Sequence, residues 1–480
     1  MVVLFFSRLM RLTGAFIVIV VLARYLGPEY LGKYLFVMAV VGFMFTLTMF
    51  GLDTMIVREV SRNKEKATHY FVTVLLLQFT LILSVYGILG LILYLINIEK
   101  ELTLAIFLAS LSQVIMFSIA ELCISIFYAF EKMKYQIILE TINKIFDLAF
   151  LGIVVYWDLG FLKLFLAMFC SSTIFASVAL WVLFKKIGKP RLHIDIPLMK
   201  FFFVEAIPLA FNNGMRQLFS RMGVFFVKYF SGDAAVAFFN APLRLLFRLS
   251  IIPDVFEKSV FPILSRIAPK NNKKVFFIFN ESVKFMGIIS IPLTLSICFY
   301  AKEVVSIVLG KGFENAVLPL QILAWIIIPS YLNKVTTTTL LAMNRQKTVA
   351  YVSAFFYLAA NLILNLLLVP LYGYIGAALA ILVVIIGQYV SLEMCIAFHV
   401  PLLSAYRQLI KPIICGTAMA VFWLGTRQLS FLFTFPVGIC LFFLLLIATK
   451  ALSENEIEII KMIFTKKTKG MVRNEELKIR

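Results

Sequence analysis

"FFFVEAIPLAFNNGMRQLFSRMGVFFVKYF", residues 201–230, is the stretch around which the chain is organised. Its polar and charged members, set among Phe, Leu, Ile, Val and Ala, include Glu205, Asn212, Asn213, Arg216, Ser220 and Arg221. A guanidinium at bilayer depth costs about 2.5–3.5 kcal/mol even on a lenient insertion scale. Such a helix is expected to turn its arginines toward water, protein or an anion. The chain turns at 231–233 and returns through a second helix that carries Arg244 and Arg248.

Composition extends this interpretation to the whole chain. Of 480 residues, 62% are hydrophobic and 15% are charged, against about 25% charged in an ordinary soluble domain. Apolar runs long enough to span a bilayer recur along nearly the whole length. The two-residue alternation of a transmembrane β-barrel is absent. The sequence therefore predicts an all-α integral membrane protein.

We count about fourteen spans, and the loops between them alternate in charge. Cations gather in every second loop, which places those loops and both termini in the cytoplasm of a multi-pass protein of the cytoplasmic (inner) membrane. The predicted spans are roughly 4–23, 34–57, 70–96, 103–129, 137–157, 161–184, 201–230, 234–260, 276–300, 316–342, 348–371, 374–398, 408–427 and 430–450.

The formal net charge of +20 would suggest nucleic acid in a soluble protein. In a membrane protein most of these cations flank helices, so we expect contact with membrane lipids and none with nucleic acid. The six cysteines and three histidines lack paired or metal-ligand spacing. The sequence therefore predicts no disulfide, no metal site and no cofactor.

An internal duplication is expected to organise the spans. Shifting the chain by 204 residues brings Arg24-Tyr25-Leu26 onto Lys228-Tyr229-Phe230, and a shift of 213 brings Gly160-Phe161 onto Gly373-Tyr374. Six spans separate the copies, so the repeat is parallel. The predicted divisions are an N-terminal lobe (1–190, spans 1–6), a C-terminal lobe (191–400, spans 7–12), two added spans (401–452) and a basic cytoplasmic tail (453–480).

Several motifs carry a resemblance to a known family. "LARYLGPEYLGKYLF" (22–36) and "FGLDTMIVREVSR" (50–62) resemble the opening of polysaccharide-transport flippases, which move O-antigen and other lipid-linked oligosaccharides. "FPILSR" (261–266) and "LVPLYGYIGAALA" (368–380) resemble the second-lobe counterparts. The superfamily also holds multidrug exporters and lipid II flippases. The resemblance implies two six-helix lobes in a V around a central cavity, and export of a sugar on a polyprenyl diphosphate.

Arg216 is the first candidate to line that cavity and to bind the cargo. It lies four residues after Asn212 and three after Asn213, so the three share a helical face. That face offers amides for sugar hydroxyls and a forked cation suited to phosphate. The alternative is a structural ion pair of Arg216 with Glu205 or Glu121.

Two further cations of the second lobe join it. Arg244 and Arg248 are one helical turn apart, a spacing at which like charges repel unless an anion or water lies between them. Lys334 lies in a polar patch of the tenth span and is a third candidate. Arg11, in the first span, could reach the cavity or could mark topology.

The remaining candidates concern coupling and gating. Glu121 and Glu393 lie within predicted spans, where a carboxylate can couple transport to an ion by changing its protonation. Arg24, Gly27 and Pro28 form the turn after the first span, where we expect a gate or a topology signal.

The expected function is therefore a flippase for lipid-linked oligosaccharide that works by alternating access and serves surface polysaccharide or glycan assembly. No bond has to be made or broken, so no enzyme activity is expected. We expect a monomer that works beside a glycan polymerase or glycosyltransferases. The alternative is an ion-coupled exporter of organic cations from the same superfamily, whose cavity would be dominated by carboxylates and aromatic rings. A membrane-embedded polymerase or glycosyltransferase would need a sizeable catalytic loop, which the sequence lacks.

Overall fold

The computed structural model describes residues 2–96, 98–188, 194–268, 272–398, 406–449 and 451; the side chains of residues 2–13, 15, 16, 96 and 212 lie outside the description. The described residues form helices joined by short turns and contain no strand. The predicted all-α class is therefore confirmed. The predicted tail, 453–480, lies outside the described residues.

The helices of the first half are α1 (Val2–Met49), α2 (Leu52–Arg62), η1 (Lys64–Lys66), α3 (Ala67–Ile96), α4 (Lys100–Ser110), η2 (Leu111–Phe117), α5 (Ser118–Ala129), α6 (Met133–Tyr156), α7 (Phe161–Lys186), α8 (Ile196–Ser231) and α9 (Asp233–Phe247). Those of the second half are η3 (Arg248–Ser250), α10 (Ile251–Ile267), α11 (Asn272–Phe299), α12 (Ala301–Val308), η4 (Glu314–Ala316), α13 (Val317–Ala324), α14 (Ile327–Ala342), α15 (Gln346–Ala354), η5 (Phe355–Ala360), α16 (Asn361–Ala397), α18 (Ile410–Gly425) and α19 (Phe431–Ala448).

Within the described ranges, 9 helical stretches are long and apolar enough to cross a membrane, and two of them join two predicted spans each. The first two spans run together as α1, and the eleventh and twelfth run together through α15, η5 and α16. The protein is therefore a multi-pass helical membrane protein. The predicted breaks near residues 24–33 and 372–373 are tight bends between helices and not loops.

Four glycines make these bends at matching points of the proposed repeat. Gly27 (φ 68°, ψ 179°) and Gly232 (φ 84°, ψ −171°) each precede the second helix of a predicted lobe. Gly160 (φ 83°, ψ 179°) and Gly373 (φ 56°, ψ −136°) each precede the sixth. Positive φ with extended ψ is a region open essentially to glycine alone. The shared conformation is what a duplicated helical bundle would retain.

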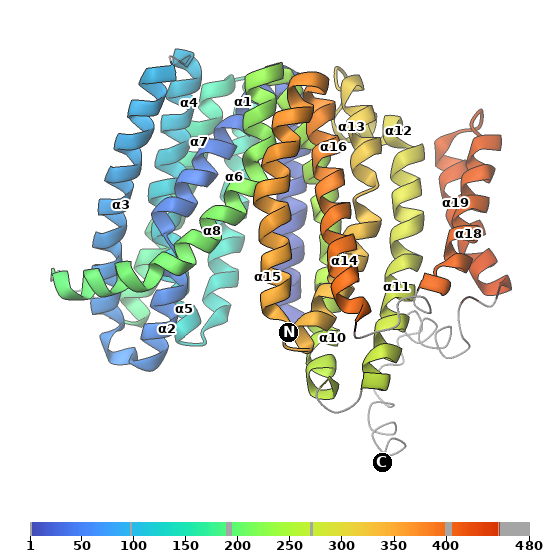
Figure 1. Ribbon diagram of the computed structural model, residues 1–480. Helices are drawn as coiled ribbons and strands as arrows, with labels where there is room; N and C mark the ends of the chain where they lie inside the picture. Colours follow the sequence, from blue (N-terminus) through green and yellow to red (C-terminus); the bar gives the residue numbers. More distant parts are fainter. Residues whose placement is uncertain are drawn as a thin grey trace. The chain divides into compact units, whose positions relative to one another are not determined.

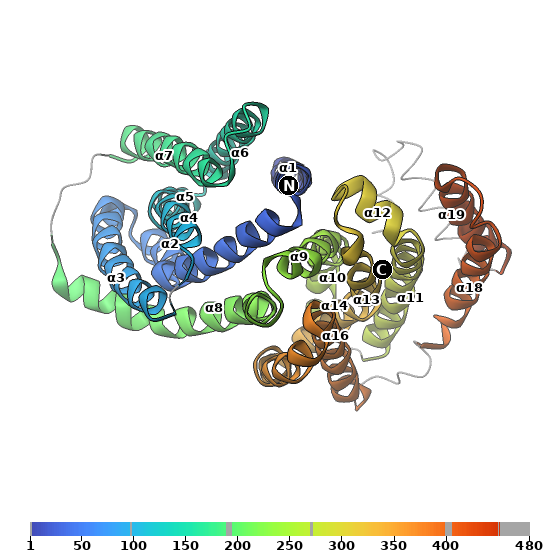
Figure 2. The ribbon, with the colours of Figure 1, turned by 90° about the horizontal axis from the view of Figure 1, so that it is seen from above.

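The chain divides into two compact units. The first comprises Met1–Leu249, Val304–Leu323 and Ser353–Val384. Its buried core joins α2, α3, α5, α7 and the start of α8. Figure 2 shows α8 passing beside α3, and Figure 1 shows that α8 is bent along its length. Pro208 lies inside this helix and removes one backbone hydrogen bond there.

Glycines bring α1 close to its neighbours α8 and α9 in this unit. A Cβ on Gly32 would overlap the carbonyl of Asp233, and one on Gly42 would overlap the guanidinium of Arg221. The same guanidinium donates to the carbonyl of Met38. Lipid tails are as apolar as leucine, so membrane helices associate through such close packing rather than through the hydrophobic effect.

The second unit comprises Ser250–Glu303, Ala324–Val352 and Ile385–Arg480. One of its clusters joins α11 to α18 and α19 around Trp423, whose indole N–H donates to the carbonyl of Thr434 at 2.9 Å. A smaller cluster joins α10, α11 and α14 through Leu264, Val275 and Ala342.

Candidate functional site

A cavity of about 280 Å³ inside the first unit brings Arg244 and Arg248 together. We call it the basic hollow. Aliphatic side chains of α1, α6 and α7 form much of its wall. Its polar lining consists of Tyr34, Gln113, Asn143, Lys144, Asp147, Ser172, Arg244 and Arg248.

The end of α9 and the turn that follows it place both guanidinium groups in the lining of the basic hollow. Arg244 lies in the last turn of α9, and its Nε donates to Oδ1 of Asn240 at 2.6 Å. Arg248 begins the tighter helical turn η3 that leads into α10. Neither arginine makes an ion pair with a carboxylate of the described residues. Their charges are left to be balanced by something the cavity admits.

One ion pair on α6 also lines the basic hollow. Nζ of Lys144 lies 2.8 Å from Oδ2 of Asp147, as their spacing of three predicts. The hydroxyl of Ser171 donates to the other carboxylate oxygen at 2.6 Å. With Arg244 and Arg248 added, three cations and one carboxylate line the cavity. The hollow therefore has a clear positive excess.

A second cavity of the first unit, about 520 Å³, holds Arg216. We call it the polar hollow. Its lining consists of Phe45, Thr46, Met49, Gly51, Asp53, Phe117, Glu121, Asn213, Arg216, Gln217 and Ser220. Here one cation meets two carboxylates, so the charge balance is the reverse of that in the basic hollow.

Arg216 and Asn213 share this hollow, as their predicted common face requires. Neither has a partner among the described residues. Glu205, one suggested partner of Arg216, instead lies 3.1 Å from Nη2 of Arg58. Gln217 is anchored, because its amide donates to the carbonyl of Gly42 at 3.0 Å. The hollow thus offers amide, hydroxyl, guanidinium and carboxylate groups at close quarters.

Phe117 lines both hollows. It ends η2, a π-helical turn, and its ring lies against those of Phe45 (5.9 Å between centroids) and Phe175 (5.5 Å). Gln113, four residues earlier, lines the basic hollow, and Glu121, four residues later, lines the polar one. Turns of this kind occur frequently at functional sites. Neither the π-helical turn nor the role of Gln113 was part of the sequence-based prediction.

Lys334 has an environment unlike that of the arginines. In the second unit its Nζ lies 2.6 Å from Oε2 of Glu257 and 3.1 Å from Oδ1 of Asp254, both on α10. Its charge is already met by two carboxylates. Its predicted role in cargo binding stays a prediction, and a structural ion-pair cluster accounts for its place.

The two candidate coupling carboxylates lie in different units. Glu121 lines the polar hollow. Glu393 is 6% exposed and accepts a hydrogen bond from the hydroxyl of Thr336. The Tyr406 hydroxyl also lies beside this carboxylate. The other carboxylate oxygen, Oε2, is buried and has no hydrogen bond of normal geometry among the described residues. Such an oxygen is costly to keep ionised, which suits a group that exchanges a proton or a cation.

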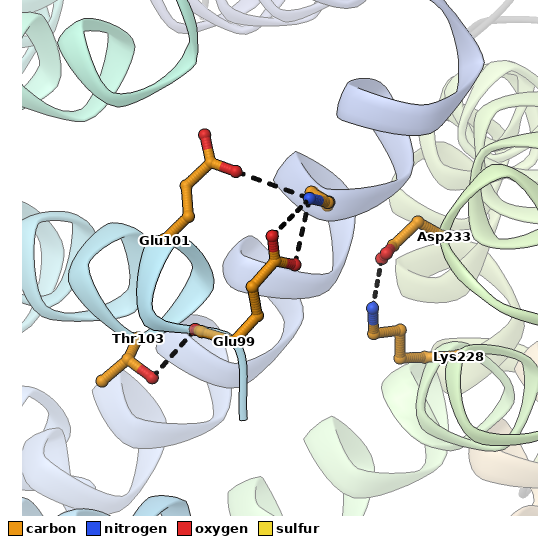
Figure 3. Close-up of polar contacts among 6 residues, drawn as sticks. Glu99, Glu101, Thr103, Lys228 and Asp233 are labelled. Atoms are coloured by element: carbon orange, nitrogen blue, oxygen red, sulfur yellow. Dashed lines mark hydrogen bonds and ion pairs between the residues drawn. The ribbon is translucent and has the colours of Figure 1, made fainter. Parts of the chain in front are cut away.

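Arg24, one of the predicted gate residues, lies in a network of polar contacts that ties several helix ends of the first unit. The guanidinium of Arg24 donates to the carbonyl of Ile307. The hydroxyl of Tyr25 accepts from the backbone N–H of Gly160 at 2.9 Å. Figure 3 shows the neighbouring ion pairs, in which Lys228 meets Asp233 and Glu99 and Glu101 approach one lysine. That lysine is Lys33, whose Nζ lies 3.0 Å from Oε2 of Glu99.

Two predicted site residues cannot be placed. The side chains of Arg11 and Asn212 lie outside the described residues. Asp53 and Lys144 line the hollows although the sequence did not single them out as cargo ligands. Their helical spacing gave no sign of it, because the residues that complete each cavity come from distant parts of the chain.

The membrane-spanning helices and the two polar cavities among them define a helical membrane transporter. The chain belongs to the polysaccharide biosynthesis protein family, which matches residues 2–268. Residues 187–446 also match the family described as lipid II flippase MurJ.

Individual relatives agree with this family assignment. A candidate O-antigen transporter of Shigella flexneri is 24% identical over 397 residues, which cover 79% of this chain and 93% of that protein. Among solved structures, lipid II flippase MurJ in an inward closed conformation matches with a TM-score of 0.73 and 16% identity, over 97% of this chain and 98% of that one. An inward-facing multidrug resistance transporter of the MATE family gives 0.63 and 15%, over 82% and 93%. At these identities the two structures support the fold alone.

Proposed function

We propose that the protein is a flippase that moves a lipid-linked oligosaccharide, carried on a polyprenyl phosphate or diphosphate, across the cytoplasmic membrane. The cargo serves surface polysaccharide or glycan assembly. The family of the chain supports the class of cargo. The protein moves its cargo without making or breaking a bond. Movement of the lobes opens the cavity to one side of the membrane at a time.

The observation that carries this proposal is the pair Arg244 and Arg248 in the basic hollow. A guanidinium with no carboxylate partner among helices is costly unless water or an anion meets it. Two of them beside an aliphatic wall suit the junction of a phosphate and an isoprenoid chain, since the fork of nitrogens matches phosphate oxygens. An organic cation would be repelled from the same place.

The remaining expectations belong to this proposal. Both termini lie in the cytoplasm, as the alternating charge of the loops favours. The lobes 1–190 and 191–400 rock about the cargo, the spans in 401–452 are an addition, and the turn at Gly27 and Pro28 belongs to the gate. The protein acts as a monomer and hands its cargo to glycan polymerase or glycosyltransferases. Glu121 or Glu393 couples the movement to a proton or sodium ion.

The test is surface glycan assembly in a host that lacks its own flippase. Replacing Arg244 and Arg248 together with glutamine is expected to abolish assembly at an unchanged amount of membrane-inserted protein, because the phosphate loses its cationic ligands. Lys66→Gln, which removes an exposed cation in η1, is the matched control and is expected to behave as the wild type. Full assembly by the double variant would contradict the proposal.

The export of organic cations is a second candidate, favoured by one observation. Asp53 and Glu121 give the polar hollow a negative excess, which suits a cation. Efflux of ethidium from proteoliposomes distinguishes the two functions. We expect no efflux above empty liposomes, and ethidium export that Asp53→Asn abolishes would favour the second candidate.

A further inference from the structure

The two hollows lie one after the other along the same pair of helices. On α1, Tyr34 and Met38 line the basic hollow, and Phe45 and Met49 line the polar one. Phe45 comes seven residues after Met38, a separation of about 10 Å along the helix axis at 1.5 Å per residue. The stretch from η2 into α5 follows the same course, from Gln113 through Phe117 to Glu121 in α5. One extended ligand can therefore reach both cavities.

The two hollows differ in the chemistry they can recognise. Arg244, Arg248 and the Lys144–Asp147 pair give the basic hollow its positive excess and its suitability for phosphate. The polar hollow contains Asn213 and Arg216 without partners among the described residues, beside Asp53 and Glu121. A mixture of donors and acceptors is what hydroxyl groups require, because each hydroxyl both donates and accepts.

We propose that the cargo is bound in two parts, with its phosphate in the basic hollow and its first sugar in the polar hollow, and that this sugar is neutral or carries an amine. This inference rests on the proposed function and specifies its substrate. Phe117 lies at the boundary and offers its ring to the link between phosphate and sugar. Asp53 and Glu121 repel a sugar carboxylate, so uronic acids are poor first sugars.

The charge balance, rather than the presence of an arginine, decides which hollow takes the phosphate. Arg216 alone would suit phosphate as well as Arg244 does. Two carboxylates line its cavity, however, so the lining carries a net negative charge that opposes a phosphate. Arg216 is therefore a ligand for sugar oxygens, and its contribution depends on the sugar being present.

Binding to the full chain in lipid nanodiscs tests the division, with the fluorescence of its 4 tryptophans as the signal. The probes are geranylgeranyl diphosphate and the same lipid diphosphate carrying either N-acetylglucosamine or glucuronic acid. Wild type is expected to bind the N-acetylglucosamine probe several-fold more tightly than the bare diphosphate. It is expected to bind the glucuronic acid probe more weakly than the N-acetylglucosamine probe.

The variants separate the two hollows. Arg248→Gln should lower the affinity for all three probes by about tenfold, the loss expected for one charge-assisted hydrogen bond. Asn213→Ala should lower the affinity only for the probes that carry a sugar. Asp53→Asn should raise the affinity for the glucuronic acid probe and leave the affinity for the bare diphosphate unchanged. Lys66→Gln should bind every probe as the wild type does.

Two results would overturn the division while the proposed function stands. One is equal binding of the bare and sugar-bearing diphosphates by the wild type. The other is an Asn213→Ala variant that loses the same affinity for the bare diphosphate as for the sugar-bearing diphosphates. Binding of none of the probes, together with failure to support glycan assembly, would instead remove the proposed function and this inference with it.

Discussion

Gly32 lies against the backbone carbonyl of Asp233 so closely that no side chain fits between α1 and α9. The contact occurs where Asp233 begins α9 and is paired with Lys228 (Figure 3). Both residues belong to the first unit. The absence of a side chain at residue 32 is therefore a condition for the packing of these two helices.

Gly32→Ala is expected to destabilise the protein by about 1–3 kcal/mol, because the added methyl group must displace the backbone of α9. Thermal unfolding in detergent, followed by tryptophan fluorescence, measures the change as a lower midpoint. Gly87→Ala is the control, since a Cβ there meets nothing within 4 Å. That variant should be as stable as the wild type or more stable, because alanine favours a helix over glycine. Equal midpoints for the two variants would show that the contact is not needed.

Gly160 and Gly232 test the bends between helices. Both have open space around a Cβ but a positive φ of 83° and 84°. Alanine at either position is expected to cost about 1–3 kcal/mol through backbone strain alone. Gly90→Ala, in equally open space on α3, should cost nothing. Unfolding midpoints that do not separate the bend variants from Gly90→Ala would contradict the account of these turns.

Lys33 tests the ion pairs of this network. Its side chain is 8% exposed and its partner Glu99 is 54% exposed, so the pair is partly screened by solvent. Lys33→Met is expected to destabilise the protein by about 1 kcal/mol, because Glu99 and Glu101 then face each other without a cation. Adding Glu99→Gln to Lys33→Met should recover part of the loss. A double variant that is less stable than Lys33→Met would argue against the pair.

Lys334 can be assigned by a charge-neutral double substitution. If its role is to hold α14 to α10, Lys334→Gln loses stability and transport because Asp254 and Glu257 are left with excess charge. Lys334→Gln combined with Glu257→Gln should regain both, with a coupling energy of about 0.5–3 kcal/mol. Glycan assembly that stays lost in a stable double variant would make Lys334 a ligand of the cargo.

Much of the fold was predictable from local pattern. Apolar runs of membrane length indicate helices whatever they pack against, and positions 144 and 147 predict their own ion pair. Local sequence pattern does not reveal contacts with residues that are distant in the sequence. Arg244 and Arg248 meet α6, about 100 residues earlier in sequence, only in the folded bundle. The sequence made Lys334 a candidate ligand of the cargo and did not reveal its carboxylate partners, because Asp254 and Glu257 lie on a different helix.

Arg216 illustrates the same limit at the site. Its helical face with Asn213 was predictable, whereas its neighbours Asp53 and Glu121 were not, since these approach from α2 and α5. The sequence placed breaks at Gly27 and Gly373, but it did not predict how tight these bends are. Glycine normally ends a helix, but here its unusual φ lets a second helix begin at once.

The π-helical turn at Leu111–Phe117 has a consequence for how the cargo of this protein could change during evolution. Such a turn differs from a regular helix by one residue, and one residue corresponds to about 100° of rotation at 3.6 residues per turn. Loss of a single codon there would re-aim Phe117 and Glu121 relative to Gln113 while the rest of the bundle kept its sequence. A new cargo could then arise by deletion, without any substitution among the groups that touch it.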